Sequence, residues 1–323
     1  MVSDCQICGN SSNNRIHRAR EMMLGLRDKF DYLECGKCGT IQIIDAPDLN
    51  RYYPPNYYSF SAANNFPKSR RHIFEARSAV KYVVNRRNLI GKFFFHKCPW
   101  LANFFPVSLT YPNLNLSFEM KILDYGCGRG SLLQRLNFFG FRNLTGADIF
   151  VESDIFYPNG VRIFKRELNE FAETFDLIML HHVFEHLPNP REILREIFRL
   201  LKPRGYAIIR LPVIAFAWRH YGVDWVQLDA PRHLFLYTAE TFSRLAEEAG
   251  FAVENVIYDS EAFQFLGSEL YKKDIPLSDK TAFDGDINKS IFTAEQLAEW
   301  NQRSAELNRK KDGDQACFYL LKP

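Results

Sequence analysis

A glycine-rich turn directly after an apolar run is the feature of this 323-residue sequence that most restricts its fold. In "ILDYGCGRGS" an apolar run ends at an acid, and Gly126, Gly128 and Gly130 follow at alternate positions. Glycines at such a turn let a helix begin close to the end of a strand and let a ligand contact the bare backbone. The turn therefore predicts a strand–turn–helix unit with a ligand at the carboxyl end of the strand.

The spacing of the three glycines excludes two common phosphate sites. A dinucleotide fingerprint needs Gly-x-Gly-x-x-Gly, but here the third glycine is Gly130 and position 131 is serine. A Walker-type loop is excluded because no Gly-Lys-Ser/Thr closes the turn. Asp148 ends the next expected strand, and an acid at that place can bind both hydroxyls of a ribose. The pattern predicts a nucleoside without a pyrophosphate, while Asp124, before the turn, can also serve as a turn cap.

Strand-like and helix-like segments alternate after residue 117. We expect helices at 131–139, from Pro190 to a stop at Pro203 and Gly205, and from a cap at Thr238 to Gly250. The expected strands lie at 121–124, 143–148, 161–168, 175–183, 206–212, 251–259 and 316–323. This order predicts an α/β fold with a doubly wound, Rossmann-like, seven-stranded sheet and ligands at the carboxyl ends of the strands.

Four motifs in this order resemble the class I S-adenosylmethionine-dependent methyltransferases. They are "ILDYGCGRG", Asp148, "FDLIMLHHVFEHLPNP" and "LLKPRGYAIIRLP", and the resemblance spans about residues 121–212 and more loosely runs to 323. It implies that S-adenosylmethionine is the cofactor. The resemblance implies a set of cofactor-binding residues, to which we add Asp124, the acid of the first strand. The set is Asp124, Gly126, Gly128, Gly130, Asp148, Glu167, Leu168 and His181.

Each matching position has its own implied role in that family. The glycine turn lies against the methionine part of the cofactor, Asp148 binds the ribose, and Glu167–Leu168 lies near the adenine. His181 lies near the sulfonium end. The "Arg-Glu-Leu" before Asn169 departs from the commoner Asp-Leu pattern of the family, which weakens the adenine assignment.

Two Cys-x-x-Cys-Gly knuckles predict a metal site in the first 45 residues. Cys5 and Cys8 form one pair and Cys35 and Cys38 the other, and a glycine follows each pair. Four thiolates are the ligand set of a closed, structural zinc site, which holds a fold and does no chemistry. A redox dithiol, an iron–sulfur site and unpaired surface cysteines are the alternatives. We expect a zinc-ribbon-like domain at 1–45, a connector with a basic helical segment at 46–117, and the methyltransferase domain at 118–323.

The segment from 68 to 105 is basic and apolar together. Apolar residues recur there at helical spacing, and nine Lys and Arg residues from Lys68 to Lys97 meet a single acid, Glu75. A helix packing on the next domain, a surface for an anionic acceptor, and an interfacial helix on a membrane all fit this pattern.

Composition sets limits on location and partners. The N-terminus is polar and lacks the apolar region of a signal peptide, and no apolar run approaches the length of a transmembrane helix. We therefore expect a cytoplasmic protein with reduced cysteines unless they bind metal. A formal net charge of +3 does not by itself argue for a nucleic-acid partner.

The whole chain also resembles enzymes of sugar and glycan biosynthesis, including sugar C-methyltransferases, through its cysteine head and its "YYPPNYYSF" connector. This resemblance implies a small-molecule or glycan acceptor, most of all a sugar or sugar nucleotide. Those sugar enzymes often carry a further C-terminal domain that this chain is too short to hold. A ribosomal or transfer RNA methyltransferase, and a non-catalytic module that binds S-adenosylmethionine, are the competing interpretations.

Methyl transfer needs a group that keeps the acceptor deprotonated, and histidine is the usual choice near neutral pH. His233 stands in a "His-Leu-x-x-Tyr-Thr" setting that resembles the base of the sugar C-methyltransferases, and it is the first candidate. His182 is the second, and His186 and Glu185 are weaker candidates on the same loop. A histidine that only pins its connector to the sheet is the alternative for His233.

Overall fold

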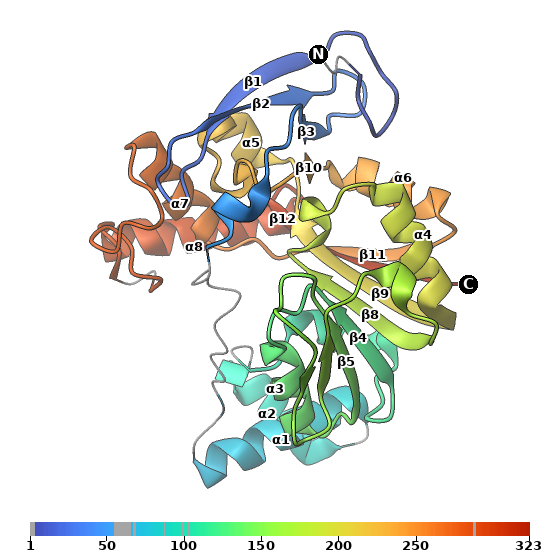
Figure 1. Cartoon of the computed structure of the whole chain (residues 1–323). Helices are drawn as coiled ribbons and strands as arrows, with labels where there is room; N and C mark the ends of the chain where they lie inside the picture. The colour runs from blue at the N-terminus through green and yellow to red at the C-terminus, as the bar shows by residue number, and fades with distance from the viewer. Residues whose placement is uncertain are drawn as a thin grey trace. The chain divides into compact units, whose positions relative to one another are not determined.

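The computed structural model of the chain describes most of its length. The described residues are 4–54, 66, 69–86, 88–98, 100–101, 104–286 and 289–323. Most of the "YYPPNYYSF" connector, together with Lys68 and Arg87 of the basic segment, lies outside these residues. Figure 1 shows the order of the elements along the chain.

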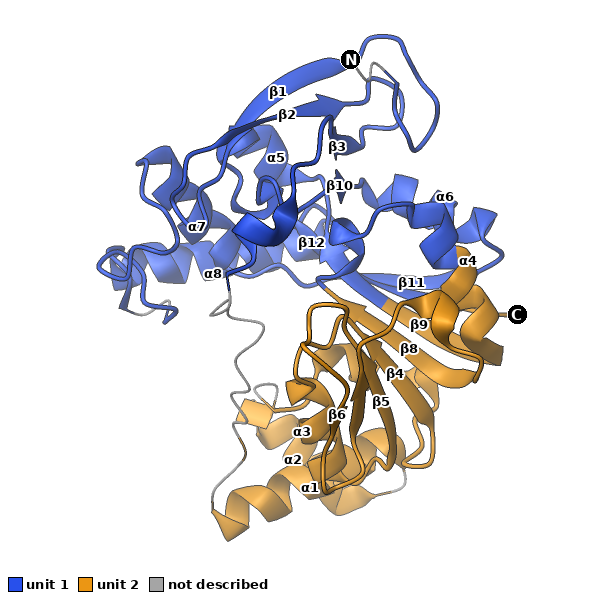
Figure 2. Ribbon diagram, in the orientation of Figure 1, with its two compact units in different colours: residues 1–54, 182–194, 209–319 blue, residues 55–181, 195–208, 320–323 orange. Residues whose placement is uncertain are grey.

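The chain divides into two compact units, each built from separate stretches of sequence (Figure 2). Unit 1 holds Met1–Pro54, His182–Leu194 and Ile209–Tyr319. Unit 2 holds Pro55–His181, Arg195–Ile208 and Leu320–Pro323. The division by contacts is therefore discontinuous, and the linear boundaries near 45 and 117 remain a prediction.

Parallel strands form the centre of unit 2. β4 (Lys121–Tyr125) pairs in parallel with β5 (Asn143–Ala147) on one side and with β8 (Phe175–His181) on the other, and β5 pairs in parallel with β7 (Arg162–Phe164). Their carboxyl ends thus share one edge, as the alternating pattern predicts. β6 (Ile155–Phe156) adds a short antiparallel strand, so the larger sheet is mixed and has eight strands instead of seven. Two residues are too few to show a period of two in the sequence.

The helix after the glycine turn has the bounds that the sequence predicts. α3 (Ser131–Phe139) follows Gly130, whose φ of 75° is in the left-handed region, and it ends at Gly140 with a φ of 113°. Leu133, Leu136 and Phe139 form its buried face. A Cβ at position 130 would lie 2.6 Å from Cδ1 of Ile163, so this glycine also permits the close approach of α3 and β7.

The boundary between α4 and β9 differs from the sequence expectation. α4 (Pro190–Leu200) ends at Leu200, and β9 (Leu201–Pro212) begins at once, so Pro203 and Gly205 lie inside the strand and do not end the helix. The reason is tertiary pairing with the last residues of the chain. Arg204 N donates to Lys322 O, and Lys322 N donates to Gly205 O, so the backbone of 204–205 is held in an extended pairing. The larger sheet has the order β11-β12-β9-β8-β4-β5-β7-β6.

A small antiparallel sheet organises the N-terminal part of unit 1. β1 (Arg15–Arg20) pairs with β2 (Lys29–Glu34), β2 with β3 (Ile41–Ile43), and β3 with β10 (Phe235–Leu236). β10 comes from a distant part of the sequence and directly follows the His233 connector. The pairing of β3 with β10 therefore ties the cysteine-bearing head to the loop that carries His233.

The remaining elements of unit 1 include two of the expected strands. Thr238 caps α6 (Ala239–Glu248) by accepting from Thr241 N at 3.1 Å, as predicted, and β11 (Ala252–Tyr258) and β12 (Gln315–Leu321) lie close to their expected ranges. The other helices are α5 (Phe216–Tyr221), α7 (Phe263–Lys272) and α8 (Ala294–Arg309).

The basic segment of unit 2 forms two helices, α1 (Arg70–Val84) and α2 (Leu89–Lys97), which pack on each other. α1 buries Ala76, Val80 and Val83, the residues that recur at helical spacing. α2 leaves large apolar side chains exposed, with Leu89 at 79% and Ile90 at 61%. In the described part of the chain, no helix has the length and apolar character needed to cross a bilayer.

Candidate functional site

The glycine turn of unit 2 adopts a backbone that only glycine takes without strain. Gly126, Gly128 and Gly130 have φ values of 75°, 55° and 75°. The turn is tied to the end of β5 at two points. Gly126 N donates to Ala147 O at 2.7 Å, and Gly128 N donates to Oδ2 of Asp148 at 2.8 Å.

Two carboxylates lie beside this turn and are largely buried. The second oxygen of Asp148 accepts from Phe150 N at 2.8 Å, so both of its oxygens are held by backbone. Burial raises the pKa of Asp148 and outweighs the hydrogen bonds from Phe150 and Gly128, which lower it. Burial, and then the charge of Asp148, raise the pKa of Asp124 to about 7, against a lowering by Arg135. A buried acid next to a glycine turn fits the hydroxyl and amino groups of a nucleoside cofactor.

The predicted adenine and sulfonium positions lie at the same edge of the parallel strands. Glu167 and Leu168 follow β7, Leu168 is buried, and Glu167 caps the short 3-10 turn Leu168–Glu170. His181 is the last residue of β8. Burial, and then the charges of Glu167 and Asp148, raise the pKa of Tyr125 to about 12, so these acids lie near one another around the end of β4. The fold thus gathers the predicted cofactor residues of unit 2 at one edge.

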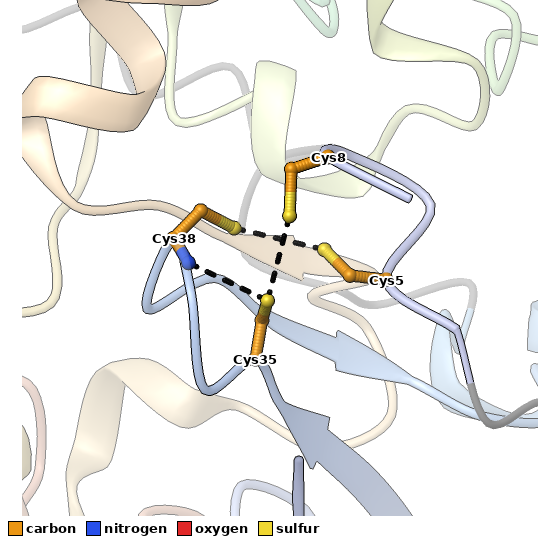
Figure 3. Close-up of side chains that lie close together, drawn as sticks. All are labelled: Cys5, Cys8, Cys35 and Cys38. Carbon is orange, nitrogen blue, oxygen red and sulfur yellow. Dashed lines mark hydrogen bonds between the residues drawn. The ribbon is translucent and has the colours of Figure 1, made fainter. Parts of the chain in front are cut away.

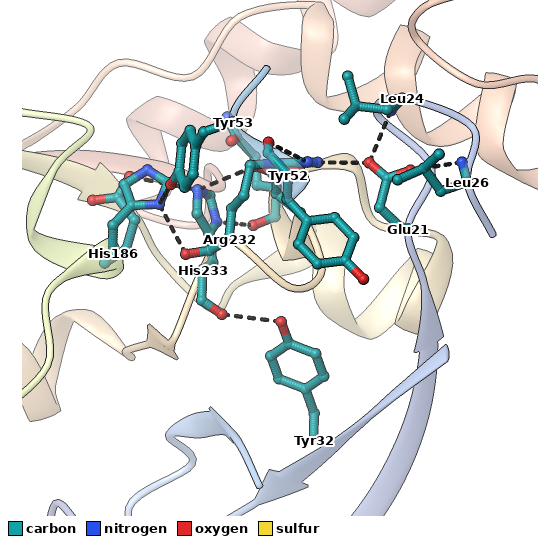
Figure 4. Close-up of polar contacts among 12 residues, drawn as sticks. Glu21, Leu24, Leu26, Tyr32, Tyr52, Tyr53, His186, Arg232 and His233 are labelled. Atoms are coloured by element: carbon teal, nitrogen blue, oxygen red, sulfur yellow. Dashed lines mark hydrogen bonds and ion pairs between the residues drawn. The ribbon is translucent and has the colours of Figure 1, made fainter. Parts of the chain in front are cut away.

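A cluster of histidines and a carboxylate lies in unit 1. Glu185, in the 3-10 turn Phe184–His186, has a side chain with no exposed surface. Its Oε1 is 3.5 Å from Nδ1 of His182 and 3.9 Å from Nε2 of His233. The rings of His186 and His233 lie 4.6 Å apart, and Figure 4 shows them next to Tyr53. The structure therefore brings together the candidate bases that the sequence singles out.

The hydrogen bonds of His233 decide which of its nitrogens carries a lone pair. Nδ1 lies 2.7 Å from the carbonyl oxygen of Gln227, which can only accept, so Nδ1 carries the proton and Nε2 the lone pair. Burial, and then the charge of His186, lower the pKa of His233 to about 4 against the raising effects of Asp229 and Glu185. Burial raises the pKa of Glu185, but His182, His186 and His233 together lower it to about 2. The cluster thus consists of a neutral His233 and an ionised carboxylate.

Sequence reasoning missed the polar layer behind this cluster. Arg232 has a side chain with no exposed surface and contacts Oε1 of Glu21 at 3.0 Å and Oδ1 of Asp229 at 2.5 Å (Figure 4). Arg232 and Asp229 lie within four residues of His233 in the sequence, so their nearness to this candidate base could have marked them as part of the site. Glu21 and Tyr53 are far from His233 in the sequence, and no local pattern marks them.

The four predicted metal ligands of unit 1 come together (Figure 3). The Sγ atoms of Cys5 and Cys38 are 3.6 Å apart and those of Cys8 and Cys35 are 3.5 Å apart, and all four sulfurs lie within 4.8 Å of one another. Four sulfurs about 2.3 Å from one zinc ion would lie about 3.8 Å apart. Backbone N–H groups of Lys37 and Cys38 each point at Sγ of Cys35 at 3.4 Å, as in a metal-binding knuckle. The cluster fits a tetrahedral zinc ion.

Comparison with known proteins shows what the parallel-sheet region is similar to. Residues 101–256 match the family model described as "Methyltransferase domain". Curated relatives named ubiquinone biosynthesis O-methyltransferase include one from Pseudomonas fluorescens, 28% identical over 126 residues, which are 35% of this chain and 54% of the relative. Another, from Xanthomonas oryzae pv. oryzae, is 29% identical over 143 residues, which are 39% of this chain and 59% of the relative. The chain spans a little over half the length of these two relatives.

Solved structures that the comparison matched include a cyclopropane synthase from Mycobacterium tuberculosis, with a TM-score of 0.42 and 15% identity over 80% of this chain and 100% of that chain. A second is an S-adenosylmethionine-dependent methyltransferase from Mesorhizobium loti, with a TM-score of 0.40 and 16% identity over 65% of this chain and 96% of that chain. The family match and the parallel strands with their glycine turn lead to one conclusion. Residues 101–256 match a methyltransferase domain and have a Rossmann-like α/β fold.

Proposed function

We propose that this protein transfers a methyl group from S-adenosylmethionine to a small-molecule or glycan acceptor, with a sugar or sugar nucleotide as the acceptor. The observation that carries the proposal is the glycine turn with Asp148 inside a matched methyltransferase domain. The relatives are named as O-methyltransferases, and transfer to an oxygen agrees with a hydroxyl acceptor.

In methyl transfer, the protein mainly aligns the cofactor with the acceptor and removes a proton from the acceptor. Methyl transfer from a sulfonium is an in-line displacement, so the cofactor and the acceptor must be held in line. In this proposal the glycine turn holds the methionine part, Asp148 the ribose, and Glu167–Leu168 the adenine. His181 lies near the sulfonium, and Asp124 supports the turn from its buried position on β4.

We assign the general base to His233, with His182 second. The Nε2 lone pair of His233 is available because Nδ1 is committed to the Gln227 carbonyl. The Nε2 atom of His182 lies 2.6 Å from Nη1 of Arg210, and a guanidinium can only donate, so this contact engages the lone pair of His182. The hydrogen bonding therefore favours His233 over His182.

The cysteine cluster supports a separate, structural role for zinc. Cys5, Cys8, Cys35 and Cys38 would supply four thiolates to one ion, which leaves no position for a substrate. Zinc held there would stabilise the knuckles at the start of unit 1, because so short a segment has little core of its own.

Exposed apolar residues on α2 favour membrane contact of segment 68–105 over RNA binding. Leu89, Ile90 and Phe93 of this helix are all exposed, and Lys92 and Lys97 on the same helix are exposed too. An interfacial helix places apolar side chains in the acyl boundary and its basic side chains near anionic headgroups. RNA methylation remains the competing function, and a lipid-linked glycan would satisfy both the acceptor and the membrane proposals.

The test is a transfer assay with labelled S-adenosylmethionine. Cell extract is separated into sugar nucleotides, lipid-linked glycans, RNA and protein, and each fraction is incubated with the full chain. We expect label in a sugar-containing fraction, and its loss with Asp148→Ala. Label only in RNA would support the competing function, and the absence of label from every fraction would support a non-catalytic module.

A further inference from the structure

Three ligand-type side chains of unit 1 lie close together apart from the cysteine cluster. One donor atom from each of Glu185, His186 and His233 lies within 4.8 Å of the others. The carboxylate of Glu185 is completely buried and makes no hydrogen bond of ordinary length within the described residues; Nδ1 of His182 lies 3.5 Å from its Oε1. A buried carboxylate that is so weakly hydrogen-bonded is costly unless a positive group compensates for its charge.

The two imidazoles are oriented as metal ligands usually are. His233 Nδ1 donates to the carbonyl oxygen of Gln227 at 2.7 Å. Nδ1 of His186 lies 2.9 Å from the carbonyl oxygen of Arg232, which can only accept, and 3.0 Å from the hydroxyl of Tyr53, which can also accept. Each ring therefore keeps its lone pair on Nε2. A histidine that binds metal almost always donates its other ring N–H to a carbonyl or carboxylate in this way.

The charged groups around the cluster carry a net negative charge that a divalent cation would balance. Among the described residues, Arg232 is the one guanidinium in contact with both Glu21 and Asp229, so these two carboxylates share a single positive charge. Asp229 lies 3.8 Å from Nε2 of His233, and Glu185 lies 3.9 Å from the same atom. Three carboxylates against one guanidinium leave a net charge of about −2 when the imidazoles are neutral. A doubly charged ion would balance this group.

We propose that Glu185, His186 and His233 bind a divalent transition-metal ion. Two imidazole nitrogens and one carboxylate, with no thiolate, suit ions such as Mn²⁺, Fe²⁺ and Zn²⁺. Ligand atoms on an ion with bonds of about 2.1 Å lie about 3.0–3.4 Å apart. The 3.9 Å between His233 Nε2 and Glu185 Oε1 needs a closing of less than about 1 Å.

This site deepens the proposed function, and the catalytic part of the inference rests on it. Three protein ligands leave coordination positions open, where an acceptor hydroxyl can bind and lose its proton more easily. With an ion bound, Nε2 of His233 would be a ligand and could not accept a proton. The ion would make the acceptor hydroxyl more acidic, and the hydroxyl proton would pass to solvent. Binding of the ion itself does not depend on methyl transfer.

The experiment measures Mn²⁺ binding to the full chain without S-adenosylmethionine or acceptor. Protein freed of weakly held ions by a mild chelator is titrated with Mn²⁺, and the free ion is measured by electron paramagnetic resonance. We expect one Mn²⁺ per chain and imidazole-nitrogen couplings in the spin-echo modulation of the wild-type protein. Glu185→Gln and His186→Gln should each weaken binding at least about tenfold, while His220→Ala, an exposed histidine outside the cluster, should not.

Two results would overturn the inference. One is a wild-type chain that binds neither Mn²⁺ nor any zinc beyond that held by the cysteines. The other is binding without nitrogen couplings that all variants retain. Because the nitrogen couplings come from the wild-type protein, the inference is tested even if a variant fails to fold. Failure of the transfer assay with Mn²⁺ bound would reject the proposed function and leave the site, whereas transfer without any bound ion would leave His233 as the base.

Discussion

Replacing Asp124 by asparagine should change how the stability of the protein depends on pH. Asp124 lies in β4 with 4% of its surface exposed, and burial and then the charge of Asp148 raise its pKa from 3.8 to about 7. The folded protein therefore keeps a proton on Asp124 that the unfolded chain has already lost. A group of this kind contributes stability that is present below the unfolded pKa and is lost as the pH rises through the folded pKa.

The two pKa values set the size of the effect. For a single group they give a loss of about 2 kcal/mol in the free energy of unfolding between about pH 5.5 and about pH 8.5. Asparagine has nearly the same shape and cannot ionise, so Asp124→Asn removes this contribution. We expect the variant to become more stable relative to the wild type, by about 2 kcal/mol, across the same pH interval.

The assay is urea unfolding of the cofactor-free protein at the two pH values, followed by circular dichroism. Asp45→Asn, at an exposed acid in the same chain, is the matched control and should follow the wild type. The reasoning is refuted if wild type and Asp124→Asn lose the same stability between the two pH values. That result would mean that Asp124 is ionised in the folded protein throughout the interval.

Three further predictions concern the cofactor, the zinc ion and the base. Asp148→Ala should weaken S-adenosylmethionine binding by about 2–4 kcal/mol, because two charge-assisted hydrogen bonds to the ribose are lost. Calorimetry measures the affinity, and an unchanged value would reject the ribose assignment. Elemental analysis should find one zinc ion held by the cysteine cluster, and the Cys8→Ser variant should lose this ion. Wild-type protein without zinc, or with iron and visible absorbance, would contradict this prediction. His233→Ala should lower turnover by about 10²–10⁴-fold and leave the affinity for S-adenosylmethionine unchanged. Turnover is measured with the acceptor that takes the label, and normal turnover would place the base elsewhere.

Local patterns were enough to predict the parts of the molecule whose residues are near one another in the sequence. The glycine turn, α3 and the cap at Thr238 follow from a few adjacent residues, and the structure confirms them. Each knuckle of the cysteine cluster is likewise a local pattern. The end of α4 was predicted wrongly, because Pro203 and Gly205 are helix stops by local rules but pair here with the end of the chain.

The sequence by itself determined the α/β class, the methyltransferase domain and the residue types of the candidate sites, since periodicity and motif spacing are properties of short segments. Only the tertiary structure decided that Glu185 is buried without a hydrogen bond of ordinary length among the described residues, and that Arg232 is shared by Glu21 and Asp229. These residues come from segments far apart in the chain. Their burial, charge balance and hydrogen bonding exist only after those segments pack, and no local pattern carries that information.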